Sequence, residues 1–399
     1  MSLLLDTGTS DTCVNVPSSD QCTAAGSPCS PFGTYAPNSS STYSYIGGGF
    51  NISVLASIVG DYATDTLTIG STNFPSMKFG IGYSSTNPQG GLGIGYPTGE
   101  SQVENDGKAV YNNIPAQMVA QGLINSNAYS LFLNDLNAST GNILFGGVDT
   151  VRYNGPLATL PLQEVDGSVS QFPITLTELS FGNVVIAKDL ALAIALVSGD
   201  TLTYLPNELA QAVFQEVGAY FDETSGGAFI PCSQASETGT LNFTFSSVTI
   251  VIPMSELVLT LLEGGSDPAF IGGQGTLACV FGIAPALGTP IQLGASFMRS
   301  AYVVFDIDNN EISLAQTNFN ANGTNVLEIG TGKESVPNAT PVANAVSATG
   351  GTSVFTSTTP TTASGLGGNQ TTSGVDRTGP VTNLGAVALV VWGIFYAQM

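Results

Sequence analysis

The chain has 399 residues and a net charge of −22, from 29 Asp and Glu against 7 Lys and Arg, and it contains no histidine. This acidity would repel a phosphate backbone, so we expect no nucleic-acid partner. The lack of histidine excludes Ser-His-Asp and Cys-His catalysis and histidine-ligated zinc. Any chemistry must therefore rely on carboxylates, hydroxyls or backbone amides, and we expect no metal site and no cofactor.

Short apolar or alternating segments, separated by Gly, Pro, Asn and Ser, follow one another from residue 1 to about residue 318. They predict closely spaced strands, with examples at 50–54, 66–70, 142–147 and 248–253. Only 114–122 and 207–220 have the pattern of a helix. The folded part of the chain is therefore predicted to be all-β.

A weak internal repeat divides this folded part. Residues 3–12 resemble residues 195–203, since each has an apolar run, a small polar turn and then threonine. An apolar segment ending in glycine follows each copy, at 91–95 and 290–294. Two copies of one half would form a two-lobed molecule with a cleft between the lobes.

Asp6 stands at the end of the first apolar run, in the sequence Asp6-Thr7-Gly8. A buried strand would deliver this carboxylate to its end, and Gly8 permits a tight turn whose amides and hydroxyls can hold it. The pattern fits a catalytic carboxylate, and it also fits an ordinary aspartate in a β-turn.

The C-terminal part changes in composition after residue 320. Serine and threonine supply 14 of the 28 residues in 347–374, typical of an O-glycosylated stalk. A polar spacer at 376–383 precedes 14 apolar residues, and Ser373 and Gly374 lie just before the spacer. This order predicts a glycosylphosphatidylinositol (GPI) signal, cut at Ser373 or Gly374. A tail anchor or a buried terminal helix is the alternative.

The expected compartment is the secretory pathway, leading to the plasma membrane or the cell wall. Five cysteines and seven Asn-X-Ser/Thr sequons support it, the sequons at Asn38, Asn51, Asn137, Asn242, Asn322, Asn338 and Asn369. The first six residues do not form a signal peptide, so we expect the native N-terminus to lie upstream. A cytosolic protein with free thiols is the alternative.

Residues 3 to about 318 resemble the pepsin-like aspartic proteases, particularly the fungal yapsin-type GPI-anchored enzymes. The resemblance rests on long segments in the family's order, at 3–10, 60–70, 91–96, 128–135, 141–149, 201–206 and 297–306. It implies a bilobal β fold with one catalytic aspartate per lobe, a water between them and a β-hairpin flap over the cleft. Asp6 takes the first catalytic position, supported by Thr7, Gly8, Ser198 and Gly199.

The resemblance also implies the domains, disulfides and partners. The lobes would span 1–152 and 153–318, followed by a stalk and spacer at 319–383 and the tail at 384–399. The family's disulfides would pair Cys22 with Cys29 and Cys232 with Cys279. We expect a monomer that acts on protein or peptide substrates and is held at a membrane through its lipid anchor.

The chain departs from the family at several positions. Val197 stands at the second catalytic aspartate, and Asp200 follows three residues later, up to about 10 Å away unless the turn is rearranged. Asp200 is therefore the candidate second carboxylate. The flap segment is two residues short, with Val54 in place of the flap tyrosine. Cys13 replaces a usual tryptophan, Ala295 replaces a usual aspartate, and the family's first strands are absent.

Three functions stay open on this evidence. The first is a cell-surface aspartic endopeptidase in which a carboxylate dyad activates water. The second is a catalytically inactive pseudo-protease that binds extended peptides in its cleft. The third is a glycosylated wall protein in which the lobes serve as a scaffold.

Overall fold

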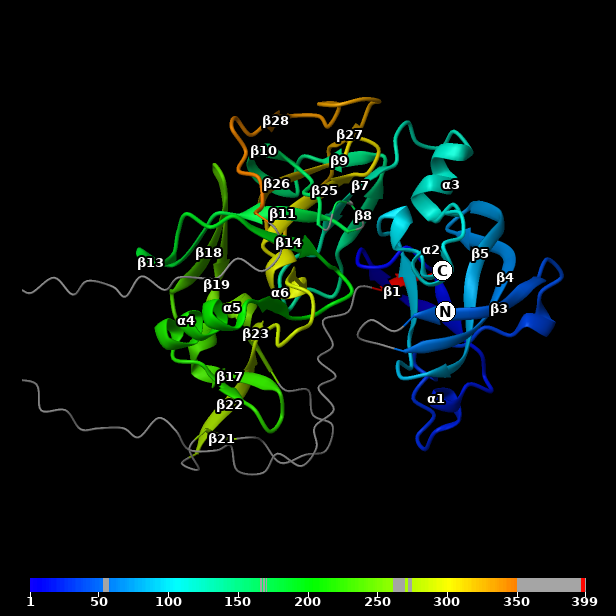
Figure 1. Cartoon of the computed structure of the whole chain (residues 1–399), viewed down its shortest axis with the longest axis horizontal. Coiled ribbons are helices and arrows are strands. Elements are labelled where there is room, and N and C mark those ends of the chain that lie inside the picture. Colours follow the sequence, from blue (N-terminus) through cyan, green and yellow to red (C-terminus); the bar gives the residue numbers. More distant parts are fainter. Residues whose placement is uncertain are drawn as a thin grey trace, which may run out of the picture.

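The computed structural model describes residues 1–52, 57–165, 167, 169, 171–260, 270–271, 275–349 and 396–398 (Figure 1). The described part consists mainly of strands with a few short helices, which confirms the all-β prediction. The two halves of the sequence lie side by side in Figure 1, the first half on the right and the second on the left. The predicted residues Val54, Asn369, Ser373 and Gly374 lie outside the described residues.

The first lobe contains a seven-stranded sheet in the order β29-β1-β6-β2-β5-β4-β3. Its strands are β1 (Ser2–Asp6), β2 (Cys13–Asn15), β3 (Ser44–Ile52), β4 (Ile58–Ile69), β5 (Thr72–Ser85), β6 (Gly90–Gly93) and β29 (Tyr396–Gln398). In β1, Leu3 and Leu5 are buried in the core, because successive side chains of a strand point to opposite faces. Strand β29 comes from the C-terminal tail and pairs antiparallel with β1.

A six-stranded sheet joins the two lobes, in the order β28-β10-β26-β25-β7-β8. Its strands are β7 (Ala128–Phe132), β8 (Asn142–Phe145), β10 (Tyr153–Pro161), β25 (Ala301–Asp306), β26 (Glu311–Thr317) and β28 (Ala339–Pro341). Strand β25 pairs with β7 of the first half, with Val303 opposite Leu131, and it pairs with β26 on its other side. The lobes therefore share a common floor.

The second lobe has three further sheets. The first, in the order β11-β14-β24-β15-β23, contains β11 (Pro173–Leu176), β14 (Leu192–Leu196), β24 (Gln292–Leu293), β15 (Thr203–Leu205) and β23 (Ile283–Pro285). The second contains β13 (Val184–Ala187), β12 (Glu178–Phe181), β18 (Thr240–Phe245) and β19 (Val248–Pro253). The third contains β16 (Tyr220–Asp222), β17 (Gly227–Pro231), β22 (Thr276–Phe281) and β20 (Val258–Leu259), with β21 (Phe270–Ile271) on β22.

The helices are short and lie between the strands. They are α1 (Asp20–Thr23), α2 (Ser101–Asp106), α3 (Ile114–Ala120), α4 (Asn207–Val217), α5 (Met254–Leu257) and α6 (Ala295–Met298), with 3-10 turns at Pro37–Ser39, Pro97–Gly99 and Cys232–Ser236. The Asn113 side chain caps α3 by accepting a hydrogen bond from the Ala116 N–H. Helix α4 buries one apolar face and ends at Gly218, whose φ is 76°. Both predicted helices are thus confirmed, each slightly shorter than expected.

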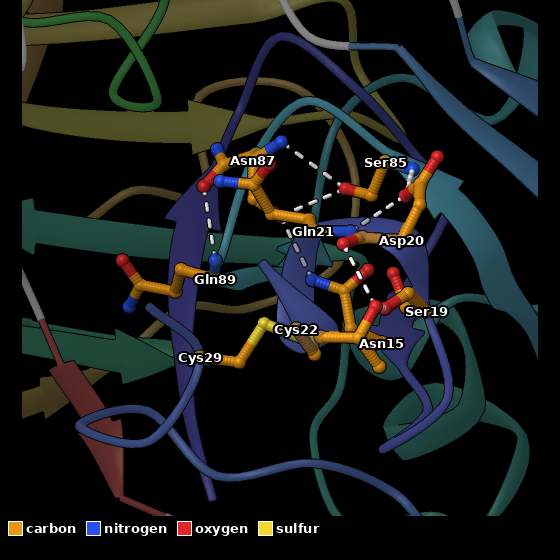
Figure 2. Close-up of a disulfide and its surroundings, with 10 residues drawn as sticks. Asn15, Ser19, Asp20, Gln21, Cys22, Cys29, Ser85, Asn87 and Gln89 are labelled. Atoms are coloured by element: carbon orange, nitrogen blue, oxygen red, sulfur yellow. Dashed lines mark hydrogen bonds between the residues drawn. A yellow bond between two sulfur atoms is a disulfide. The ribbon is translucent and has the colours of Figure 1, made fainter. Parts of the chain in front are cut away.

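Both expected disulfides are present, Cys22–Cys29 and Cys232–Cys279. Figure 2 shows the first of them beside the loop that carries Asn87 and Gln89. The second joins residues 47 positions apart, a loop closure that stabilises the fold by about 4 kcal/mol. Cys13 is a free, buried cysteine among the described residues.

Residues 319–349 return to the folded body, although the sequence assigns them to the stalk. Strand β27 (Val326–Glu328) pairs with β9 (Gly147–Asp149), and β28 pairs in parallel with β10. Ile329 and Val336 are buried in the same cluster as Tyr302. A stalk can therefore begin only beyond Thr349, and most of its predicted extent lies outside the described residues. Among the helices that the structure describes, none is long and apolar enough to cross a membrane.

Candidate active site

Asp6 lies at the carboxyl end of β1, opposite Gly93 of β6. Its Oδ1 accepts a hydrogen bond from the Gly8 N–H at 2.7 Å. The backbone of Gly199 in the second lobe also donates to this carboxylate. A Cβ on Gly199 would lie 2.3 Å from the Asp6 Cγ, so only glycine permits this approach. Burial raises the pKa of Asp6, and the two backbone hydrogen bonds oppose that effect.

Thr7 and Ser198 link the two lobes next to Asp6. The Thr7 N–H donates to Ser198 Oγ at 3.1 Å, and the Ser198 N–H donates to Thr7 Oγ1 at 2.9 Å. Each hydroxyl also donates across the lobes, Thr7 to the Leu196 carbonyl and Ser198 to the Leu5 carbonyl, both at 2.8 Å. The two turns therefore hold each other through four hydrogen bonds.

Val197 occupies the place opposite Asp6 and is 7% exposed. A Cβ on Gly8 would lie 2.7 Å from the Val197 Cγ1, which shows how closely this side chain approaches the first turn. The Val197 backbone N–H donates to the Leu293 carbonyl, while its side chain has no group that could bond to Asp6 or to a water. The backbone at position 197 is therefore held by hydrogen bonding, but its side chain supplies no carboxylate.

Asp200 lines the same cavity as Asp6. The turn that carries it closes with the Asp200 N–H donating to the Val197 carbonyl, and the Ala295 N–H donates to the Asp200 carbonyl at 2.7 Å. Gln292 Nε2 donates to the Asp200 Oδ2. Burial, and then the nearby Asp6 charge, raise the pKa of Asp200 to about 6, while hydrogen bonds to its carboxyl from the Gln292 side chain and from the backbones of Leu202 and Thr201 act in the opposite direction. The turn therefore brings a second carboxyl into the cleft.

The cavity between the lobes has a volume of about 360 Å³. Its lining comes from both lobes: Leu4, Asp6, Gly8, Thr9, Asp11, Cys13, Asn51, Ile52, Ile58, Asn87, Gln89, Gly90, Gly91, Gly99, Ser101, Asn105, Gln171, Val197, Gly199, Asp200, Pro290 and Gln292. The cavity therefore combines the carboxyls of Asp6 and Asp200 with walls from both lobes.

The hairpin of β3 and β4 forms one wall of this cavity. Cys13 packs beneath it in a small cluster with Phe50, Ile58 and Tyr62. The Phe50 and Tyr62 rings meet edge to face at 5.1 Å, and the Tyr62 hydroxyl lies 2.7 Å from Ser101 Oγ. Residues 53–56, between these two strands, lie outside the described residues, so the shortened flap stays a prediction.

A second group of carboxyls, which sequence reasoning missed, consists of the buried residues Asp11, which lines the cavity, and Glu100. Asp11 accepts hydrogen bonds from the Ser101 N–H at 2.6 Å and from the Tyr111 hydroxyl. Glu100 accepts from the Tyr111 N–H at 2.9 Å, and burial raises the pKa of Glu100 to about 8. Lys78 lies over the Tyr111 ring. The only sequence signal for this group is Asp11 directly after the Asp6 turn.

A family model described as eukaryotic aspartyl protease matches residues 1–317, and the chain belongs to this family. It is a peptide hydrolase of the aspartic type, since its relatives are named aspartic-type endopeptidases.

Individual relatives and a solved structure agree with this assignment. The probable aspartic-type endopeptidase opsB of Aspergillus oryzae is 47% identical, over 86% of this chain and 71% of the relative. The probable aspartic-type endopeptidase OPSB of Arthroderma benhamiae is 43% identical, over 99% of this chain and 82% of the relative. Secreted aspartic protease 8 of Candida albicans is 35% identical, over 79% and 72%. The crystal structure of an aspartic proteinase from Irpex lacteus has the same fold, with a TM-score of 0.64 at 21% identity over 81% of this chain and 92% of that one.

Proposed function

We propose that the protein is a cell-surface endopeptidase that cleaves extended polypeptides in the cleft between its lobes, with Asp6 and Asp200 as the catalytic carboxyls. The observation that supports this most directly is that both side chains line one buried cavity. In the family pattern the second carboxyl would come from position 197, so the pair here is a displaced one.

The two carboxyls would act as a coupled pair. Burial raises the pKa of each, and the charge of Asp6 raises the pKa of Asp200 further. Such a pair shares one proton over the acidic range. The ionised member takes a proton from water, and the protonated member donates to the substrate carbonyl oxygen as the water attacks. Gly8 and Gly199 orient Asp6, and Gln292 orients Asp200.

A second function, peptide binding without cleavage, is favoured by one observation. Val197 fills the place opposite Asp6 with an apolar side chain while the surrounding hydrogen bonds stay intact. A cleft preserved around an inactive centre would still hold peptides.

Hydrolysis of a peptide library by the full chain at pH 3–6 separates these functions. Asp6→Asn and Asp200→Ala should each lower kcat by about 10²–10⁴-fold, the usual effect of losing one positioned proton-transfer group. No cleavage by the unmodified chain, together with saturable peptide binding, would establish the second function. Cleavage that survives Asp200→Ala would remove Asp200 from the mechanism.

We also propose that the chain is anchored by GPI lipid at Ser373 or Gly374. The order of small residues, polar spacer and short apolar tail in the sequence supports this. Phosphatidylinositol-specific phospholipase should release the protein from membranes of its native cells without residues 384–399. Mass spectrometry that finds the tail in the mature protein would contradict this proposal.

A further inference from the structure

The cavity is lined mainly by carboxamides and small residues. Six lining side chains end in an amide: Asn51, Asn87, Gln89, Asn105, Gln171 and Gln292. Among the described lining residues there is no aromatic ring and no lysine or arginine. The walls therefore offer hydrogen-bond donors and acceptors to a substrate side chain alongside the apolar surface of residues such as Leu4, Ile52 and Ile58.

Gln89 stands out among these amides. It is only 3% exposed, and its Nε2 has no hydrogen-bond partner among the described residues. Its backbone N–H donates to Asn87 Oδ1 at 3.0 Å, and in Figure 2 its side chain points away from the hydrogen bonds of Asn15 and Ser85. A buried donor without a partner costs about 1–3 kcal/mol. A ligand atom that accepts a hydrogen bond there would recover this cost.

Next to Gln89, the cavity is lined by the backbone of Gly90 and Gly91, which have no side chains. A Cβ on Gly90 would lie 2.5 Å from the Cys13 carbonyl oxygen, so this strand position must be glycine. Gly91, the next residue, lies between Leu4 and Cys13. Gln89 precedes Gly93, the strand partner of Asp6, by four residues. The distance between Gln89 and Gly93 along the strand is therefore about 13 Å. A peptide bound across Asp6 can therefore present a side chain to Gln89.

The charges around the cavity restrict that side chain. Gln89 Nε2 is a donor, and an ammonium or a guanidinium group has no acceptor, so either group would leave Nε2 without a partner. A carboxylate could accept from Gln89, but Asp6, Asp11 and Asp200 line the same cavity and would repel it. A neutral acceptor remains, and a carboxamide also offers an NH₂ group to the amide oxygens of the wall.

We propose that this subsite selects an uncharged carboxamide side chain, Gln or Asn, with Gln89 as the specificity-determining residue. The substrate class would thus be polypeptides that carry a glutamine or an asparagine at the one position that faces Gln89. The inference rests on the proposed function only in placing a peptide in the cleft, and not on its cleavage.

The test uses the full-length protein and extended peptides that carry Gln, Asn, Leu, Lys or Glu at each position in turn. Cleavage is measured by kcat/KM at pH 4, and binding is measured by fluorescence anisotropy with the Asp6→Asn variant. At one position, Gln or Asn should be preferred over Leu, Lys and Glu by about tenfold, the effect of one neutral hydrogen bond. If no peptide is cleaved but the preference appears in binding, the proposed function fails and this inference stands.

Two substitutions should shift the preference in opposite directions. Gln89→Leu should abolish the preference for Gln and raise that for Leu, while Gln89→Glu should favour Lys. Gln121→Leu, at an exposed position outside the cavity, is the matched control and should change nothing. Thermal unfolding checks that each variant folds. An identical preference in wild type and both Gln89 variants, or no peptide binding at all, would overturn the proposal.

Discussion

Thr7 and Ser198 hold each other across the lobes, because the backbone N–H of each donates to the side-chain oxygen of the other. The link joins residues 191 positions apart in the sequence and lies directly beside Asp6. Whatever the second carboxyl is, the scaffold that would position it is intact. Changes in this link should therefore affect stability and activity together, whereas changes in the carboxyls should affect mainly activity.

Ser198→Ala should destabilise the fold and reduce activity together. It leaves the Thr7 N–H without its acceptor and removes the bond to the Leu5 carbonyl, at a cost of about 1–3 kcal/mol for a buried unsatisfied donor. Urea unfolding measures the change. Ser198→Thr is the matched control, since it keeps the hydroxyl, and equal stability of all three proteins would contradict the described bonds.

Val197→Asp should raise the rate of peptide hydrolysis. A carboxylate at this position would face Asp6 directly and restore the arrangement implied by the family resemblance. In that background Asp200→Ala should have little effect, although it should be severe in the wild type. Measuring kcat/KM at pH 4 for the wild type, the two single variants and the double variant gives the coupling free energy between positions 197 and 200. If Val197→Asp lowers the rate instead, the active site is adapted to the pair formed by Asp6 and Asp200, and a carboxylate at position 197 disturbs it.

Gln292→Leu should shift the pH dependence of activity upward. The Gln292 amide stabilises the ionised form of Asp200, so its loss should raise the pKa of Asp200 above about 6, by about one unit. The protonated acid would then persist to higher pH, and the alkaline limb of kcat/KM should move with it. Gln171→Leu, in the same cavity, should leave this limb in place. An unchanged limb for Gln292→Leu would show that Asp200 does not titrate in the mechanism.

The protein should be more stable in acid than at neutral pH. Folding raises the pKa of Glu100 to about 8 and the pKa values of Asp200 and Asp306 to about 6, in each case mainly through burial. Carboxyls of this kind stabilise the fold below their unfolded pKa values, and this contribution is lost as the pH rises through the folded values. The melting temperature should therefore fall between pH 4 and pH 8.

Glu100→Gln should remove part of that fall, because glutamine can still accept from the Tyr111 N–H and carries no charge. Differential scanning calorimetry at pH 5 and pH 8 should show a melting temperature about 5 °C higher than wild type at pH 8. Glu223→Gln, at an exposed position, is the matched control. A wild-type curve that rises toward pH 8 would contradict the assigned direction.

Glycosylation should follow exposure of the sequons. Five described sequons are exposed, at Asn38, Asn51, Asn137, Asn322 and Asn338, whereas Asn242 is half-buried and its Nδ2 donates to the Gly182 carbonyl at 3.1 Å. We expect glycans at these five positions and none at Asn242. Peptide mapping before and after deglycosylation of the protein from its native cells is the measurement. A modified Asn242 would show that β12 and β18 are paired differently.

The first half of the site could be predicted from the sequence because its causes are local. Three leucines fix Asp6 at the end of a buried strand, and the next two residues, Thr7 and Gly8, supply the turn and its hydrogen bonds. The internal repeat gives Ser198 and Gly199 the same place in the second lobe. The bilobal fold follows from the same repeat and from the family resemblance.

The direction of Asp200 could not be predicted, since distant residues set it. Its side chain is held by Gln292, 92 positions away, and its carbonyl accepts from Ala295. The burial of Glu100 likewise depends on the chain that returns at Tyr111. The same is true of 319–349, where polar composition suggests a stalk and only two buried side chains, Ile329 and Val336, fix the segment to the body.

The return of that segment determines how the molecule would bear tension. The backbone N–H groups of Val346, Ala348 and Thr349 donate in turn to Ser246 Oγ, Gln163 Oε1 and the Ala191 carbonyl, and β28 lies just before them on β10. All of these acceptors lie within residues 153–318, the predicted second lobe. A pull applied to the chain just after Thr349 would therefore load the second lobe first, whereas a pull on the last residues of the chain would load the strand that ends at Asp6, through its pairing with β29.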